Sequence, residues 1–530
     1  MIDVQYNLAR GTLKGLADES SFLLSNNAGS FFYHDWKTRN GGWFVHDEDT
    51  FRVIAEMRTA SPQVSAIIHS GSKVEMKKNG IREMFTLPEG KNVLVYKTNT
   101  PLDTDIFLDV KKLNDNRQWG RHYNIKVEGG KTIIHFVKST DAREDKTNGQ
   151  HEYDFYIVLD KPARVIKRWE ERLYTDETHD AASYSRLVFH TVRVWATSMT
   201  ITAGRNLQQA LEAQKDVRIK QRVNNESALT VQALKNFLEP SGVKSAFPAQ
   251  WRARDEIIAA AALAKISSQH TKEIIMRNAR AIMNDGRLTE TITSETRTTD
   301  GTGWLFKRCH EMIDMFSPEE KKYLADKVVD IIETLHERHT KDGFAFDVIE
   351  DTQTIDAQAL RLALYKSAFG LTKNELYNEF EKKLKNKVRD AYWNGEQLAQ
   401  SRGNYNPHPR IVIAAYVYPD LLTKEEWSSC FTQMLKGTWL EWGGLKIEEK
   451  SLFWINNIAA LCFLRTNKTL FHNHIQKIMN ASKREMLWQG CLGMHGESSA
   501  AATLKSNGSY ADIKSTATYM ELMDELKRQK

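Results

Sequence analysis

Short apolar runs separated by turns occupy the first third of the chain. The runs are rich in β-branched and aromatic residues, and several alternate apolar with polar positions, which is typical of half-buried strands. Gly-Gly, Asn-Gly and Glu-Gly pairs between them suit hairpin turns. The pattern predicts an antiparallel β-sandwich as the N-terminal domain, residues 1–165. The clearest runs are 31–33, 43–45, 64–69, 92–96, 132–137 and 153–159.

After about Pro162 the apolar positions follow a helical period instead. The amphipathic stretch from Ser183 to Arg222 predicts connecting helices, within a linker over residues 166–223. From 224 to 530 helical segments alternate with loops that are short on one side and long and polar on the other. This alternation predicts repeated helical hairpins with the functional loops on one face.

Composition narrows the class of protein without deciding its function. A chain of 530 residues exceeds one ordinary core, so at least two domains are expected. The net charge of +6 is spread over 74 basic and 68 acidic residues with no long basic block, which does not indicate nucleic acid. The four cysteines lie far apart, so neither a zinc site nor a disulfide framework is expected. We expect a cytoplasmic protein with no membrane partner, because the chain shows neither a charged leader nor an apolar stretch of about 18 residues.

A cluster of aromatic, guanidinium and carboxylate groups stands at one predicted helix start, Trp251-x-x-Arg254-Asp255. Aromatic faces pack on the C–H faces of a sugar ring, while Arg and Asp form directed, charge-assisted hydrogen bonds to hydroxyls. The alternative is an ordinary helix start, with Asp255 near the positive end of the dipole and solvated arginines. The cluster is therefore a candidate sugar-binding site.

A long loop and the helix start after it carry four carboxylates between residues 347 and 356. A carboxylate held near aromatic residues and like charges has a raised pKa, as a general acid needs near neutral pH. The alternative is the acidic first turn of the following helix, with Thr354 or Asp356 as its cap. The four acids are Asp347, Glu350, Asp351 and Asp356. Capping accounts for one of them but hardly for all four.

A second acid, Glu497, lies in a sharply turning loop rich in glycine and small residues. Inverting glycoside hydrolysis needs two carboxyl groups about 6.5–9.5 Å apart, one to donate a proton and one to activate water. Two acidic loops on one face could supply them, although a solvated loop acid is an equally good interpretation of Glu497. Asp300 is expected to cap the next helix start, and Trp304 faces either a pocket or the core.

The region from about 180 to 530 resembles the glucoamylase-like and glycogen-debranching glucosidases, which use an (α/α)6 barrel. The Trp251-x-x-Arg254-Asp255 stretch is similar to the family motif that grips the nonreducing-end sugar. Residues 347–351 resemble the family loop whose Glu is the general acid, although Ile349 replaces the usual Trp. Residues 496–519 resemble the closing segment, in which Glu after Gly is the catalytic base, and the N-terminal β-region resembles the β-sandwich of prokaryotic relatives.

The resemblance implies an N-terminal antiparallel β-sandwich followed by an (α/α)6 catalytic barrel over residues 224–530. It implies an inverting, exo-acting glycoside hydrolase that releases glucose from α-linked oligosaccharides or polysaccharides, of the glucoamylase or α-1,6-glucosidase type. Paired carboxylates supply the proton chemistry, so no metal or organic cofactor is expected. The implied catalytic pair is Glu350 as acid and Glu497 as base, with Trp251, Arg254, Asp255, Asp300, Trp304 and Asp351 as substrate-binding residues.

Several alternatives stay open. Asp351 or Asp356 could replace Glu350 as the acid. The same barrel could act on another α-glucoside such as trehalose, or could be a phosphorylase. A noncatalytic glycan-binding protein is the alternative from another class, favoured by Ile349 and by the altered closing segment. Residue types alone fix neither the linkage, the chain-length preference nor the oligomeric state.

Overall fold

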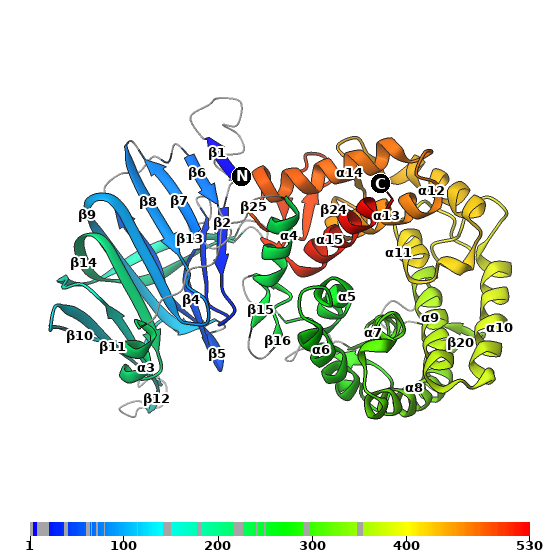
Figure 1. The fold of residues 1–530 in the computed structure, drawn as a ribbon, viewed down its shortest axis with the longest axis horizontal. Coiled ribbons are helices and arrows are strands. Elements are labelled where there is room, and N and C mark those ends of the chain that lie inside the picture. Colours follow the sequence, from blue (N-terminus) through cyan, green and yellow to red (C-terminus); the bar gives the residue numbers. More distant parts are fainter. Residues whose placement is uncertain are drawn as a thin grey trace. The chain divides into compact units, whose positions relative to one another are not determined.

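The chain forms two compact units. One comprises Met1–Ser241 with Met486–Met494, and the other comprises Gly242–Glu485 with His495–Lys530. The first is mostly strand and the second mostly helix, as the sequence predicts (Figure 1). The computed structural model describes residues 4–7, 21–35, 41–59, 64, 66–69, 73–78, 80–113, 115–140, 150–176, 182–215, 226–239, 242–247, 251–289, 297–346 and 353–529.

Fifteen of the described strands of the first unit belong to one connected sheet around a hydrophobic core. Alternation places every second side chain inside, as with Ile134 and Phe136 of one strand and Phe155 and Ile157 of its neighbour. The sheet runs β1-β6-β7-β8-β9-β5-β4-β3-β2-β25, with β14 joining β9 to β12 and β13, and β11 joining β12 to β10. The strands are β1 (Val4–Asn7), β2 (Ser21–Ser25), β3 (Phe31–Asp35), β4 (Gly42–Asp47), β5 (Asp49–Thr59), β6 (Ala66–His69), β7 (Lys73–Lys78), β8 (Ile81–Thr86), β9 (Val93–Lys112), β10 (Arg121–Glu128), β11 (Lys131–Ser139), β12 (His151–Leu159), β13 (Arg164–Asp176), β14 (Ala182–Gly204) and β25 (Cys491–Leu492).

The predicted linker helices over 166–223 are wrong where the structure describes them, apart from the short helix α3 (Leu207–Ala213). Most of this stretch is the strand pair β13–β14, and β14 also pairs with β9. Two β-bulges, at His190/Val192 and Ala196/Ser198, shift the register of β14 against β9. Each bulge moves the apolar positions by one residue, so the period of two is broken and the spacing imitates a helix.

The second unit contains a closed ring of helices (Figure 1). In its described part, each inner helix packs on the next, and α15 returns to α5. A buried inner helix is apolar on all sides, and every residue of α13 from Phe453 to Leu464 is buried. The inner helices are α5 (Ala253–Leu263), α7 (Asp300–Glu311), α9 (Ile355–Thr372), α11 (Arg410–Val417), α13 (Phe453–Asn467) and α15 (Ile513–Arg528).

A second set of helices packs around this ring. These helices bury a single stripe, as in α10, where Tyr377, Leu384, Val388 and Tyr392 are buried among charged residues. No helix in the described part is long and apolar enough to cross a membrane. The outer helices of this unit are α6 (Ser268–Ala281), α8 (Pro318–Arg338), α10 (Glu375–Tyr392), α12 (Lys424–Thr438) and α14 (His472–Arg484). The helix α4 (Glu226–Lys235) falls within the first unit.

Candidate active site

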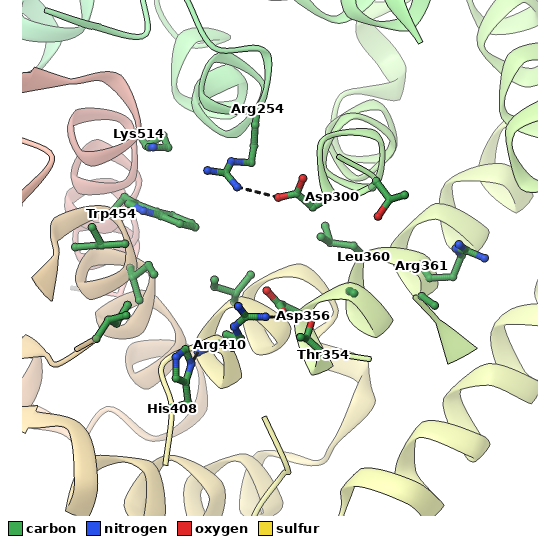
Figure 2. Close-up of a pocket in the computed structure, with 18 of the residues that line it drawn as sticks. Arg254, Asp300, Thr354, Asp356, Leu360, Arg361, His408, Arg410, Trp454 and Lys514 are labelled. Atoms are coloured by element: carbon green, nitrogen blue, oxygen red, sulfur yellow. Dashed lines mark hydrogen bonds and ion pairs between the residues drawn. The ribbon is translucent and has the colours of Figure 1, made fainter. Parts of the chain in front are cut away.

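A cavity of about 390 Å³ lies where the inner helices begin (Figure 2). Each inner helix contributes a lining residue in or next to its first turn, so the positive ends of several helix dipoles face one space. Such a site favours ligands rich in oxygen and carboxylate side chains placed among the helix ends. These first-turn residues are Arg254 of α5, Asp300 of α7, Asp356 of α9, Arg410 of α11, Trp454 of α13 and Lys514 of α15.

The predicted sugar-binding residues Arg254 and Asp300 line this cavity together. Arg254 Nη1 lies 3.0 Å from Asp300 Oδ2, as the dashed line in Figure 2 marks. Asp300 is the first residue of α7 and not its cap, which is Thr299. The ion pair fixes both side chains while leaving donors and acceptors facing the cavity.

Asp255 lies behind the cavity wall and does not line it. Its carboxylate is fully buried and lies 2.9 Å from Lys514 Nζ, the lining residue of α15. Burial alone would lower the pKa of Lys514, but Asp255 and Asp512 outweigh it, and the pKa of Lys514 lies above its usual value. Asp255 therefore holds a charged lysine at the cavity.

Glu497 reaches the cavity from the loop that precedes α15. Its carboxylate accepts a hydrogen bond from the Ser509 amide at 3.0 Å and lies 3.6 Å from Arg252 Nη1. Burial opposes ionisation, yet Lys514, Ser509 and Arg252 together hold the pKa of Glu497 below its usual value. Glu497 is thus ionised at neutral pH, which is the state that a general base needs.

Asp356 lines the same cavity from the start of α9. Burial raises the pKa of its carboxyl, with a further upward push from Asp300, although Arg410, 3.7 Å away, opposes both. One carboxyl group with a raised pKa and another with a lowered pKa in the same cavity are the arrangement of an acid and a base. The predicted residues Glu350 and Asp351, and also Asp347, lie outside the described residues.

The two tryptophans predicted as pocket walls are not among the residues that line the cavity. Trp304 is 2% exposed and packs against Tyr416, with ring centroids 6.0 Å apart. Trp251 donates from Nε1 to Glu256 Oε2 at 3.1 Å. The aromatic wall comes instead from Trp454, which the sequence pattern favours as a buried helix aromatic.

Several other lining residues escape sequence reasoning. Arg410, His408 and Arg361 carry no motif, and Lys514 lies in the closing segment without an assigned role. One signal could have found most of them, because they lie in or beside the first turn of every second helix. If every second helix start lines the cavity, as the hairpin alternation implies, His408, Arg410 and Lys514 are expected there. Arg361 is not, because it lies further along α9.

Glu485 packs against the loop that carries Glu497. It is buried and accepts a hydrogen bond from Ser506 Oγ at 2.7 Å. Gly496 lies so close that a Cβ there would collide with Glu485 Oε1, which explains the glycine before Glu497. Burial raises the pKa of Glu485 to about 7, although Ser506 and the Gly496 amide oppose the change.

Replacing Glu485 with Gln should flatten the dependence of stability on pH. The folded chain keeps a proton that the unfolded chain releases near pH 4.5, so folding stability falls as pH rises from about 4.5 to about 7. The full effect is about 3 kcal/mol. Urea unfolding at pH 5 and pH 8 measures it, with the exposed Glu333→Gln on α8 as control. An unchanged pH dependence in Glu485→Gln would contradict the raised pKa.

The fold and site together define a strand-rich unit followed by a ring of helices with a carboxylate-lined cavity at one end. No protein-family model matches the chain, and no curated protein does. Among solved structures, the chain is similar to a bacterial glucoamylase complexed with acarbose, with a TM-score of 0.63 and 9% identity over 96% of this chain and 94% of that one. The chain has the fold of bacterial glucoamylase.

Two other solved structures match a smaller part of the chain. A glycosidase covers 57% of this chain and 96% of its own length at 10% identity, with a TM-score of 0.47. The cellobiose 2-epimerase from Bacillus thermoamylovorans B4167 covers 54% of this chain and 92% of its own length at 9% identity, with a TM-score of 0.43.

Proposed function

We propose that this chain is an inverting, exo-acting glycoside hydrolase that releases glucose from α-linked glucosides, with the inner and outer helices forming an (α/α)6 barrel. The observation that carries the proposal is one cavity with two carboxyl groups, Asp356 and Glu497, whose pKa values are pushed in opposite directions. Inversion needs one protonated and one ionised carboxyl group at the same pH. The glucoamylase fold supports the same class of reaction.

In the proposed mechanism Glu497 takes a proton from the attacking water. The acid that protonates the leaving oxygen comes from residues 347–356. The family resemblance favours Glu350, with Asp351 as an alternative, and the described geometry favours Asp356. Arg254 and Asp300 hydrogen-bond the terminal sugar, and Trp454 packs on its face.

Exo-action needs a cavity that is closed at its inner end. Gly303 lines the cavity, whereas Arg308, further along the same helix α7, is 1% exposed and donates a hydrogen bond to the Tyr416 hydroxyl at 3.0 Å. A pocket that is closed in this way admits the end of a glucan chain and excludes its middle. The terminal residue is then the one cleaved.

The proposal is tested by incubating the protein with maltose, isomaltose, trehalose and glycogen and following the products by NMR. Release of glucose that is initially the β-anomer from an α-glucoside would support the proposal, since one inversion converts α to β. Initial α-glucose would overturn inversion. The absence of product from the whole panel would favour the noncatalytic glycan-binding alternative.

Replacing Asp356 with Asn identifies the acid. If Asp356 donates the proton, kcat on maltose should fall by about 10²–10⁴-fold, because the amide cannot act as an acid. Activity on α-glucosyl fluoride, whose leaving group needs no proton, should survive, and the alkaline limb of the pH profile should disappear. The matched variant is Glu350→Gln. The same pattern in that variant, with Asp356→Asn unaffected, would assign the acid to Glu350.

Phosphorolysis is the second candidate, favoured by the two cations beside Glu497. Arg252 lies 3.6 Å from Glu497, and Lys514 acts on it electrostatically. A phosphorylase replaces the attacking water with phosphate, which needs such cations. Phosphate-dependent formation of glucose 1-phosphate would establish this reaction, and its absence with glucose still released would leave hydrolysis.

A further inference from the structure

A second, smaller cavity shares Arg361 and Ala345 with the candidate active site. It has a volume of about 180 Å³ and is formed by α8, α9, α10 and the hairpin of β20 (Thr340–Lys341) and β21 (Phe344–Ala345). Among the described residues, four basic side chains and no carboxylate line it. They are His336, Arg361, Lys383 and Lys387.

Arg361 carries the buried charge of this cavity. The residue is only 6% exposed, and its guanidinium donates to two neutral oxygens, Thr340 Oγ1 and the His339 carbonyl, each at 3.3 Å. Within the described residues Arg361 forms no ion pair. Figure 2 shows its side chain turned away from Asp300 and Asp356. A buried charge that only neutral acceptors meet is costly unless an anion accompanies it.

Two lysines of α10 add permanent charge to the same cavity. Lys383 and Lys387 are one helical turn apart and therefore share a face. Lys387 donates to the Asp342 carbonyl at 2.5 Å, and neither lysine pairs with a carboxylate in the part of the chain that the structure describes. Two nearby acids have other partners: Asp342 pairs with Arg402, and Glu381 accepts a hydrogen bond from Tyr418.

His336 contributes a neutral donor or acceptor rather than a fourth charge. Its Nε2 lies 2.5 Å from the Tyr365 hydroxyl. Burial and the charge of Arg361 lower the pKa of His336, so the ring is neutral at physiological pH. Three like charges thus face one small space, which favours a ligand with more than one negative charge.

We propose that this cavity binds a phosphate-type oxyanion, either free or as the phosphoryl group of a sugar phosphate. A guanidinium fork donates hydrogen bonds to two oxygens of such a group, and two lysines can neutralise the remaining charge. The cavity is large enough for a phosphoryl group with part of its carrier. Because Arg361 and Ala345 line both cavities, a bound anion would contact the wall of the candidate active site.

Calorimetric titration of the full chain at constant ionic strength tests this site, with inorganic phosphate in one arm and glucose 6-phosphate in the other. The test variant is Lys383→Gln/Lys387→Gln. The control is Lys382→Gln/Lys385→Gln, which makes the same charge change on the same helix outside the cavity. Saturable binding in wild type and control, with affinity roughly tenfold lower or lost in the test variant, is the expected result. Tighter binding of glucose 6-phosphate than of inorganic phosphate would show that the cavity binds the phosphoryl group of a sugar phosphate.

The measurement is independent of the proposed enzyme activity. A phosphorylase would also bind phosphate beside Glu497, but the α10 substitutions leave that site intact, so the test variant would lose one site and keep the other. Circular dichroism confirms that both variants fold. Equal binding by the test variant and the control, or no saturable binding by the wild type, would overturn the proposal.

Discussion

Replacing Glu497 with Gln should lower kcat on an α-glucoside by about 10³-fold, with KM little changed. The amide has the size of the carboxylate but cannot take a proton from water. The Ser509 amide and Arg252, which position Glu497, remain in place. An interaction made mainly in the transition state is lost, so kcat falls while substrate binding persists.

The control for this result is Glu448→Gln. Glu448 lines the same cavity but lies in an exposed turn, so its loss should leave kcat within a few-fold of the wild type. A complementary variant, Glu497→Ala, leaves space for azide. Azide needs no base, so it should restore bond cleavage and give the β-glucosyl azide. Undiminished turnover by Glu497→Gln would remove Glu497 from the mechanism.

The alternation of apolar residues predicts the large-scale fold because burial repeats regularly along the chain. The boundary between the strand-rich and helical parts is the exception. The bulges of β14 break its period of two. No single residue type marks a bulge, so the sequence pattern of a bulged strand resembles that of an amphipathic helix. The 183–204 region therefore reads as an amphipathic helix until its partners β9 and β13 are known.

Motifs near helix starts predict part of the site. Arg254, Asp300 and Glu497 all line the cavity, because a first turn or a tight loop fixes where such side chains point. Trp304 does not line the cavity, for a local reason. It lies one position after the lining residue Gly303, and one step along a helix turns a side chain by about 100°. The Trp304 side chain therefore faces the core.

Contacts that close the ring could not be predicted from local patterns. Asp255 and Lys514 meet only because the first and last inner helices are adjacent. In the sequence Asp255 looks like a sugar ligand, whereas in the structure it positions the lysine that lowers the pKa of Glu497. The role of a charged residue thus depends on a partner far along the chain.

The first unit contains a charge cluster that no motif predicts. Asp109 of β9 is fully buried and contacts three arginines, with Arg121 Nη1 at 2.8 Å, Arg186 Nε at 3.0 Å and Arg52 Nη1 at 3.3 Å. Lys111 follows on the same strand, and burial together with Arg186 lowers its pKa to about 8. One carboxylate therefore offsets several buried positive charges.

Replacing Asp109 with Asn should destabilise the first unit by about 3–5 kcal/mol, because the arginines lose their shared counterion while they stay buried. The transition of this unit in calorimetric unfolding of the full chain measures the effect. The matched control is Asp103→Asn, an exposed aspartate on the same strand, which should change the free energy of unfolding by no more than about 0.5 kcal/mol. Because Asp109 raises the pKa of Lys111, its loss lets Lys111 deprotonate below about pH 8 and relieve part of the repulsion, so the deficit of Asp109→Asn should shrink as pH rises toward about 8. Equal stability of the two variants would show that the arginines do not depend on the charge of Asp109.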